Sequence, residues 1–468
     1  MVSNEMMQRI ERFVEENRQS IVADIKKLVD IKSVSGAPEG ADAPFGAGCH
    51  QVLDTALEMC GAMGFATKNY DYYCGSASIG SGEKEIALLG HLDVVPEGKG
   101  WSHDPYDMIE KDGYIYGRGV SDDKGPTVLG LYALKFLKEQ NIPLNYTYRL
   151  VLGCSEETGM ADMKHFMEVE KIPNFAFTPD ADFPGIIGEK GGLGFAIRFP
   201  VDGKVLTALQ GGTVPNAVCG EVTAELTGVS ESDLGSYDPA VYTVEAMEGG
   251  IRVTAKGKTS HAAKPEGSVN AIALLFALLE KLPQASEMEK KTARGVLAVL
   301  SDYNGAGIGI PVEDEPSGKL THISGLAHLE GNEVVLSFDI RYPVTYNGLE
   351  LMEKVKAHVA AMGFTAVLDH DSKPSYRPAD TQEVQCLMQA YEQVTGEKGV
   401  PVVIGGGTYA RHFPNAIAFG PHFEEMPNPA GEGKGGEHMP DECTSVDYMM
   451  KAVRIYILAL LGLNELSL

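Results

Sequence analysis

The chain has 468 residues, more than a single ordinary core accommodates, so its length predicts two or three domains. Its 65 acidic side chains outnumber its 39 basic ones and give a net charge of −26. This charge argues against nucleic acid as a partner, because nucleic-acid binders neutralise phosphates with Lys and Arg. Seven scattered cysteines without a CxxC pair are typical of reduced thiols in a cytoplasm and exclude a zinc finger.

Neither end of the chain has the pattern of a membrane or secretion segment. The N-terminal residues 1–19 include acidic side chains where a signal peptide needs a basic start and a long apolar run. The apolar stretch Ile455–Leu463 is far too short to span a bilayer and indicates a buried helix. We therefore predict a cytoplasmic protein with no membrane partner.

The first part of the chain alternates between helices and strands. Helical periodicity covers residues 5–31 and 48–64. The later elements predicted before residue 186 are a strand at Glu85–Leu89, a helix at Thr127–Gln140, and strands at Tyr146–Leu152 and Phe175–Phe177. Such alternation predicts an α/β domain with a mainly parallel sheet flanked by helices, whose functional residues gather at the carboxyl ends of its strands.

The pattern changes after residue 186, where glycines separate shorter alternating runs. These runs predict strands at Gly192–Phe199, Ala217–Leu226, Arg252–Gly257, Leu320–Glu330 and Val334–Tyr342. Helices are predicted at Ala271–Leu282 and Leu349–Met362, and another at Val384–Gly396 marks the return of the α/β pattern. We predict a catalytic domain formed by residues 1–185 and 379–468, interrupted by an inserted α+β lid domain, residues 186–378. The segment Ser301–Glu315 is too irregular to assign.

Polar clusters with metal-binding chemistry follow the predicted strands. His91 and Asp93 stand two apart after the Glu85–Leu89 strand, so their side chains point the same way. The histidine can bind a metal, while the aspartate can accept its other ring N–H and fix the tautomer. Such a pair alone also occurs by chance or for structural reasons.

A glycine-rich segment with two adjacent carboxylates precedes the Thr127–Gln140 helix. Asp122 and Asp123 end the sequence GRGVSDD, whose glycines could cradle a phosphate at a helix start. The spacing fits neither the P-loop nor the dinucleotide-binding motif, and paired carboxylates would repel phosphate. A metal site suits them better, because one carboxylate can bridge two cations.

Three further loops carry candidate ligands. Glu156 and Glu157 directly follow the Tyr146–Leu152 strand, where two acidic groups are costly unless a charge compensates them. One can bind a metal while the other acts as a general base, although a solvated acidic helix start is an alternative. Asp180 follows the next strand, and His438 lies in a loop before the final helix. Two divalent ions would neutralise this set of carboxylates.

Taken in order, five motifs resemble those of the co-catalytic zinc metallopeptidases, a superfamily that includes aminoacylase, glutamate carboxypeptidase and succinyl-diaminopimelate desuccinylase. The likeness is greatest to the PepV-type dipeptidases of bacteria and extends over nearly the whole chain. No motif is convincing alone, but their order and spacing match: HLDVVPEGKGW, GRGVSDDKGP, SEETG, TPDADFP and GEHMPDE.

The resemblance implies ligands for two divalent metal ions. One ion would be held by His91 and Asp180, the other by Glu157 and His438, and Asp122 would bridge them. The resemblance favours zinc, with manganese or cobalt as alternatives that the ligand types suit equally.

Catalytic roles also follow from the resemblance. Glu156 would act as the general base on water between the metals, forming a bridging hydroxide, and Asp93 would orient His91. His261, at the end of the sequence GKTSH, matches a histidine that stabilises the developing oxyanion. Without this motif, His261 would be taken for a surface residue.

Substrate-binding residues are implied in the insert and after it. Asn216 matches a substrate-contacting asparagine of the PepV-type enzymes, and Arg341 matches the arginine that binds the substrate carboxylate. The GGGTYAR sequence supplies Gly407, Thr408 and Arg411 as further substrate contacts. Because both domains contribute residues, closure of the insert over the site is expected.

These assignments predict hydrolysis of the peptide bond in dipeptides. The alternative with the same two metals is an N-acyl amino acid deacylase of the desuccinylase or deacetylase type, which the glycine-rich sequence before His438 favours. A third alternative, a non-catalytic metal or peptide binder, is opposed by the intact Glu156. The large insert is expected to replace the dimerisation surface of a second subunit, so we predict a monomer.

Overall fold

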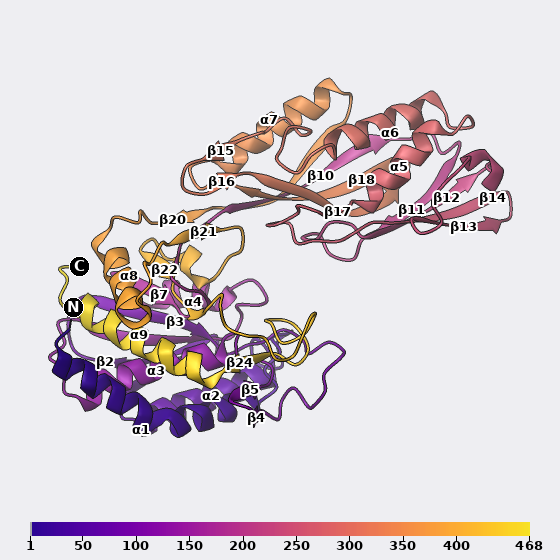
Figure 1. Cartoon of the computed structure of the whole chain (residues 1–468). Coiled ribbons are helices and arrows are strands. Elements are labelled where there is room, and N and C mark those ends of the chain that lie inside the picture. The colour runs from indigo at the N-terminus through magenta and orange to yellow at the C-terminus, as the bar shows by residue number, and fades with distance from the viewer. Residues whose placement is uncertain (1) are drawn as a thin grey trace. The chain divides into compact units, whose positions relative to one another are not determined.

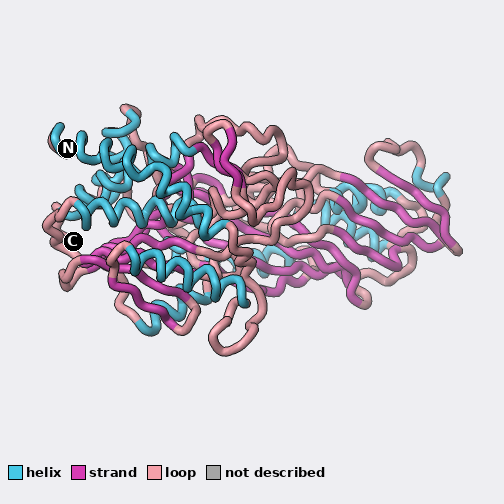
Figure 2. Tube along the Cα trace, turned by 90° about the horizontal axis from the view of Figure 1, so that it is seen from below, coloured by secondary structure: helices cyan, strands magenta, loops and turns pink. Residues whose placement is uncertain are grey.

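The computed structural model describes residues 2–468 and divides the chain into two compact units (Figure 1). The first unit contains the residues up to Ile187 together with Tyr376–Val402 and Gly407–Leu468. The second contains Gly188–Ser375 and the short segment Val403–Gly406, so in the sequence it interrupts the first. The first and last described residues, Val2 and Leu468, both belong to the first unit (Figures 1 and 2).

A nine-stranded sheet forms the centre of the first unit. Its strand order is β1 (Ala66–Tyr70), β2 (Cys74–Ile79), β6 (Thr147–Gly153), β3 (Glu85–His91), β7 (Phe175–Thr178), β22 (Ala416–Ala418), β9 (Ile186–Glu189) and β20 (Ser375–Tyr376), with β21 (Val402–Ile404) paired to β9. The four strands from β6 to β22 run parallel, whereas β1, β2 and β9 pair antiparallel. The predicted parallel sheet is therefore confirmed for its centre, while its edges are antiparallel.

Helices cover both faces of this sheet, because its central strands are apolar on both sides. Leu88 of β3 lies close to Gly130 of α3, and α3 packs in turn against α1 and α9. The neighbouring Leu89 points to the opposite face and forms a core with Met163 and Phe166 of α4. The helices of this unit are α1 (Asn4–Val29), α2 (Ala47–Ala62), α3 (Lys124–Glu139), α4 (Ala161–Val169), α8 (Gln382–Thr395) and α9 (Val446–Asn464). Among the described residues, no helix is both long and apolar enough to cross a membrane.

Helix α3 begins at Lys124, earlier than the predicted start at Thr127. Its first turn contains Pro126, which is tolerated there because the N–H groups of a first turn have no partner within the helix. The earlier start places Asp122 and Asp123, joined by a cis peptide bond, directly at the beginning of the helix. The unit also contains two small sheets. In one, β4 (Ile109–Lys111) and β24 (Cys443–Ser445) each pair with β5 (Tyr114–Tyr116), and in the other β8 (Ala181–Asp182) pairs with β23 (Pro421–His422).

The second unit is an eight-stranded antiparallel sheet with helices packed against it (Figure 1). Its strand order is β13 (Tyr242–Met247), β14 (Gly250–Lys256), β12 (Glu221–Thr227), β11 (Leu206–Gly211), β17 (Thr321–Glu330), β18 (Glu333–Tyr342), β10 (Gly191–Pro200) and β19 (Thr365–Ser372). The helices are α5 (Ala271–Lys281), α6 (Glu287–Val299) and α7 (Gly348–Ala361), and a short hairpin joins β15 (Glu313–Asp314) to β16 (Gly318–Lys319). This α+β architecture is the class predicted for the insert.

Two features of the second unit differ from the sequence prediction. Helix α6 was not predicted, although Ser286 and Glu289 form a capping box at its start. The strand predicted at Ala217–Leu226 begins only at Glu221, because the backbone before it bonds to a neighbouring loop through Val218 N–H and the Ser260 carbonyl, at 2.9 Å.

Candidate metal centre and active site

The five predicted metal-ligand residues all belong to the first unit. His91 is the last residue of β3, and Glu157 and Asp180 follow β6 and β7, so three of the five come from the carboxyl ends of adjacent parallel strands. Asp122 precedes α3, and His438 lies in the long loop before β24. The sheet and the start of a helix therefore bring residues from distant parts of the sequence to one place.

Asp122 lies between two groups of candidate ligands. Its Oδ1 is 3.0 Å from His91 Nε2, and its Oδ2 is 2.9 Å from His438 Nε2. Asp180 completes the first group, at 3.8 Å from His91 Nε2, and Glu157 completes the second, at 3.1 Å from His438 Nε2. Within each group the ligand atoms lie within 4.8 Å of one another, a separation that a metal ion can span.

The chemistry of these groups fits divalent cations. His91 Nε2 is a buried ring nitrogen that faces carboxylate oxygens of Asp122 and Asp180, at 3.0 and 3.8 Å, an arrangement that suits a shared metal ion. Burial raises the pKa of Asp180 to about 7, and the negative charge of Asp122 adds to the effect. Imidazole and carboxylate ligands suit zinc, manganese and cobalt. Two such ions would compensate a charge that is costly to bury.

Glu156, the predicted general base, lies beside Glu157 in the loop after β6. Burial raises the pKa of its carboxyl group, and the charges of Asp180 and Glu157 raise it further, whereas His91 opposes them. The carboxyl group of Glu156 is therefore close enough to the candidate ligands for their charges to change its pKa. Its role as the base stays a prediction.

Asp93 makes contacts that the sequence did not indicate. The hydrogen-bond partner of His91 Nδ1 is the main-chain oxygen of Asp93, at 3.0 Å, while the carboxylate oxygen lies at 3.4 Å. The two carboxylate oxygens of Asp93 instead accept the amide N–H groups of Glu156 and Glu157, each at 3.1 Å. Asp93 therefore connects the histidine to the loop that carries both glutamates.

A second buried carboxylate, Asp162, bonds to the residues of the same loop that directly precede Glu156 and Glu157. Its Oδ2 accepts the amide N–H groups of Cys154 at 2.7 Å and Ser155 at 2.8 Å, and it also accepts the Tyr409 hydroxyl. Four consecutive amides, residues 154–157, thus bond to two aspartates. Sequence reasoning did not find Asp162, because a single aspartate in a helical segment carries no signal. Tyr409 was overlooked within the GGGTYAR sequence.

Replacing Asp162 by alanine is expected to lower the free energy of unfolding by about 2–5 kcal/mol, because three amides and a hydroxyl would lose their buried acceptor. Urea denaturation measures this loss. Tyr409→Phe is the matched control, because it removes one donor and leaves Asp162 with its three amides, so about 1 kcal/mol is expected. A loss below about 1 kcal/mol for Asp162→Ala would contradict the structural role.

Two of the predicted substrate-contacting residues, Asn216 and His261, lie in adjoining loops of the second unit. The main-chain oxygen of Asn216 accepts the N–H of Ala262 at 2.9 Å, and Ala217 forms an isolated β-bridge with His261. Burial and the positive charge of Arg341 lower the pKa of His261, which favours the neutral imidazole. A neutral imidazole can still donate a hydrogen bond to an oxyanion.

Arg341, on β18, is fixed by its neighbours in the second unit. Its Nε and Nη2 donate to the two carboxylate oxygens of Asp339, at 2.7 and 3.0 Å, and its Nη1 donates to the Gly405 carbonyl at 3.0 Å. These three bonds, in the part of the chain that the structure describes, leave two of the five guanidinium N–H groups for another acceptor. These bonds hold the guanidinium in one orientation, and its role as a substrate contact stays a prediction.

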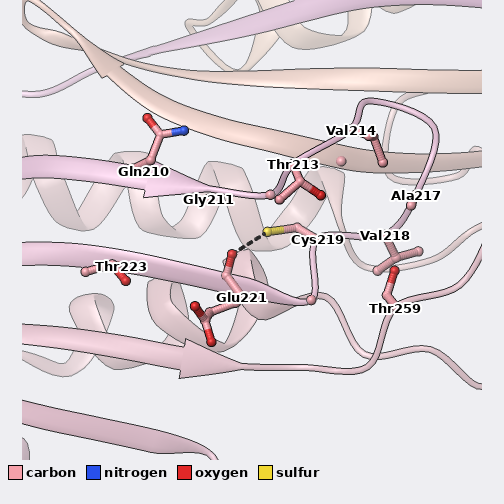
Figure 3. A pocket seen from close by; sticks show the side chains of 13 residues that line it. Gln210, Gly211, Thr213, Val214, Ala217, Val218, Cys219, Glu221, Thr223 and Thr259 are labelled. Atoms are coloured by element: carbon pink, nitrogen blue, oxygen red, sulfur yellow. Dashed lines mark hydrogen bonds between the residues drawn. The ribbon is translucent and has the colours of Figure 1, made fainter. Parts of the chain in front are cut away.

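A cavity of about 440 Å³ lies beside the loop that carries Asn216 (Figure 3). Its walls include Thr213 and Ala217 of that loop, Glu221 at the start of β12, and Thr259, which precedes His261 by two residues. The side chains of Asn216 and His261 are not among the lining residues. The volume falls within the range of small-molecule sites.

The remaining predicted contacts, Gly407, Thr408 and Arg411, belong to the first unit. Thr408 is buried, and its hydroxyl oxygen accepts the N–H of Ala410 at 3.2 Å, which begins a short 3₁₀ turn over Tyr409–His412. The turn packs against the core under β3 and β7. The structure thus divides the predicted substrate contacts between the two units.

The α/β unit gathers two histidines and three carboxylates, three of the five residues at strand ends, with a further glutamate beside them. This donor set suits metal-assisted hydrolysis, the chemistry of the metallopeptidases, which are hydrolases. The sequence matches the family model for peptidase family M20/M25/M40 over residues 87–462. The chain therefore belongs to this peptidase family, whose members use divalent metals.

Full-length relatives support the same assignment. The chain is 34% identical to the putative dipeptidase YtjP of Bacillus subtilis (strain 168), a match that covers 96% of this chain and 98% of the relative. It is 28% identical to the Beta-Ala-Xaa dipeptidase of Lactobacillus delbrueckii subsp. lactis, over 96% and 97% of the two chains. These matches extend through both units.

Solved structures share the fold. Human carnosine dipeptidase 1 matches with a TM-score of 0.59 at 14% identity, over 98% of this chain and 99% of that one. Aminoacylhistidine dipeptidase from Vibrio alginolyticus matches with a TM-score of 0.58 at 13% identity, over 94% and 96%. At these identities the likeness establishes the fold alone.

Proposed function

We propose that this peptidase hydrolyses the peptide bond of dipeptides. The observation that carries the proposal is the position of Asp122, whose two oxygens face two separate groups of one histidine and one carboxylate each. The names of the two relatives above, both dipeptidases, support the substrate class.

The donor set assigns residues to each of two divalent ions. His91 and Asp180 would hold one, Glu157 and His438 the other, and Asp122 would bind both. When bound, such ions polarise a carbonyl and lower the pKa of water. Zinc is the proposed metal, with manganese or cobalt as alternatives.

The other predicted residues act on the substrate and the proton. Glu156 accepts the proton of the attacking water and delivers it to the leaving amine. His261 donates a hydrogen bond to the developing oxyanion, and Arg341, held by Asp339, binds the C-terminal carboxylate of the dipeptide. Asn216 contacts the substrate as well, and so do three residues of the GGGTYAR sequence: Gly407, Thr408 and Arg411.

Removal of the metals is expected to abolish hydrolysis reversibly. Chelator-treated protein should be inactive, and titration with zinc, manganese or cobalt should restore turnover of dipeptides, measured by release of free amino acids. Full activity of protein shown to be metal-free would contradict the proposal.

The substrate class is tested on the restored enzyme with a panel of dipeptides and matched acetyl- and succinyl-amino acids. Dipeptides are expected to be the better substrates, and C-terminally amidated dipeptides should have a raised KM because Arg341 would lack its carboxylate. Faster turnover of the acyl amino acids than of every dipeptide would establish a deacylase instead. The monomeric state and the cytoplasmic location stay predictions from the sequence, and the first is tested by gel filtration with light scattering.

A further inference from the structure

Glu442 is a buried carboxylate four residues after His438, with no exposed surface. Its Oε1 accepts three main-chain N–H groups, those of Gly119 at 3.0 Å, Ser121 at 2.9 Å and Asp122 at 3.3 Å. Its Oε2 accepts Nη1 of the equally buried Arg118 at 2.6 Å. One side chain therefore binds the loop that ends at Asp122 through four donors.

The main chain around Glu442 is joined to the same loop. The Glu442 carbonyl accepts the N–H of Gly117 at 3.0 Å, and the Cys443 carbonyl accepts the Ser121 hydroxyl at 3.2 Å. Asp441, which directly precedes Glu442, accepts the Ser102 N–H and Nζ of Lys434, a residue before His438, both at 2.6 Å. The segment that carries His438 is thus anchored at its end against the loop that carries Asp122.

This arrangement favours a charged acceptor. Three amides that converge on one oxygen bond most strongly when that oxygen carries negative charge, and an anion also compensates the buried charge of Arg118. The amide of Asp122 itself takes part, so a shift of the Glu442 side chain moves the backbone of the residue that faces both histidines.

We propose that Glu442 is a positioning residue that fixes Asp122 relative to His438 and thereby sets the affinity of the chain for two divalent cations. The proposal rests on the proposed metal function. It assigns a task to the acidic residue that ends the GEHMPDE sequence, which is not itself a member of either candidate ligand group but bonds to the main chain of Asp122.

The test variant is Glu442→Gln, which keeps the shape and one carbonyl oxygen but removes the charge and turns an amide donor toward Arg118 or toward the loop. Asp24→Asn is the matched control, because Asp24 is also a buried carboxylate, bonded to Tyr132 and Lys27 on α3 and α1 rather than to a ligand loop. Glu442→Asp serves as a second variant. It retains the charge opposite Arg118 but shortens the reach to the three amides by one carbon.

Each protein is stripped with a chelator and titrated with Zn²⁺ in competition with a metal-indicator dye, and folding is monitored by circular dichroism. Glu442→Gln is expected to bind zinc about 10–100-fold more weakly than the wild type, as when groups that support metal ligands are removed. Glu442→Asp should also bind zinc more weakly than the wild type, and Asp24→Asn should bind it as tightly as the wild type. Turnover of Glu442→Gln should recover when zinc is in large excess.

Wild-type zinc affinity in a folded Glu442→Gln protein, or in Glu442→Asp where the first variant does not fold, would overturn the proposal. An equal loss of affinity in Asp24→Asn would also overturn it, because the effect would then reflect general destabilisation. A wild-type chain that binds no pair of ions would instead refute the proposed metal function, so the two failures are distinguishable.

Discussion

Glu156→Gln is expected to reduce kcat by about 10²–10⁴-fold, the usual contribution of a general base, while the protein still binds two metal ions per chain. Glu156 is not a member of either ligand group, although it lies beside Glu157 in the same loop. Glutamine keeps the size of the side chain, and the hydrogen bond from the main-chain N–H of residue 156 to the Asp93 carboxylate is unaffected. The variant therefore loses the proton acceptor without losing the architecture around it.

Steady-state kinetics on a dipeptide and elemental analysis of the same preparation measure the two expectations. Glu85→Gln is the matched control, since Glu85 lies at the opposite end of β3 from His91, pairs there with Arg149 and belongs to neither ligand group. It should leave kcat unchanged. Near-normal turnover in Glu156→Gln would remove Glu156 from the role of base, and loss of metal would show that it is a ligand.

Asp122→Ala is expected to remove both metals, because Asp122 is the residue that faces both histidines. The loss of zinc affinity should exceed the roughly 100-fold effect of removing a group that merely supports a ligand, and turnover should fall with it. His438→Ala should weaken one ion alone, since His438 belongs to a single group. The contrast between these variants tests whether Asp122 is shared.

The number of metal ions bound per chain after dialysis, together with the zinc affinity from dye competition, distinguishes loss of both ions from loss of one. Two tightly bound ions in Asp122→Ala would refute the bridging assignment, and so would equal losses in Asp122→Ala and His438→Ala. Circular dichroism of the metal-free proteins excludes unfolding as the cause.

The strands of the first unit that the sequence predicted were those with continuous apolar runs. The strands β3, β6 and β7 are buried almost throughout, so their hydrophobic residues stand out, and each ends next to a candidate ligand. The strands β1 and β2 were missed because the first is mostly exposed and the second consists largely of small residues. Sheet pairing rather than local preference forms them.

By itself, the sequence determined the class of fold and the chemical identity of the candidate ligands, because apolar runs and the histidines and carboxylates that follow them are local features. The resemblance of the motifs predicted Asp122 as the shared residue, but only the tertiary structure gives its distances to His91 and His438 and shows that Asp162 and Glu442 hold the loops around them. The reason is physical: these bonds join side chains to amides of distant segments, 323 residues apart for Glu442 and Gly119, and a contact of this kind leaves no periodic pattern in the chain.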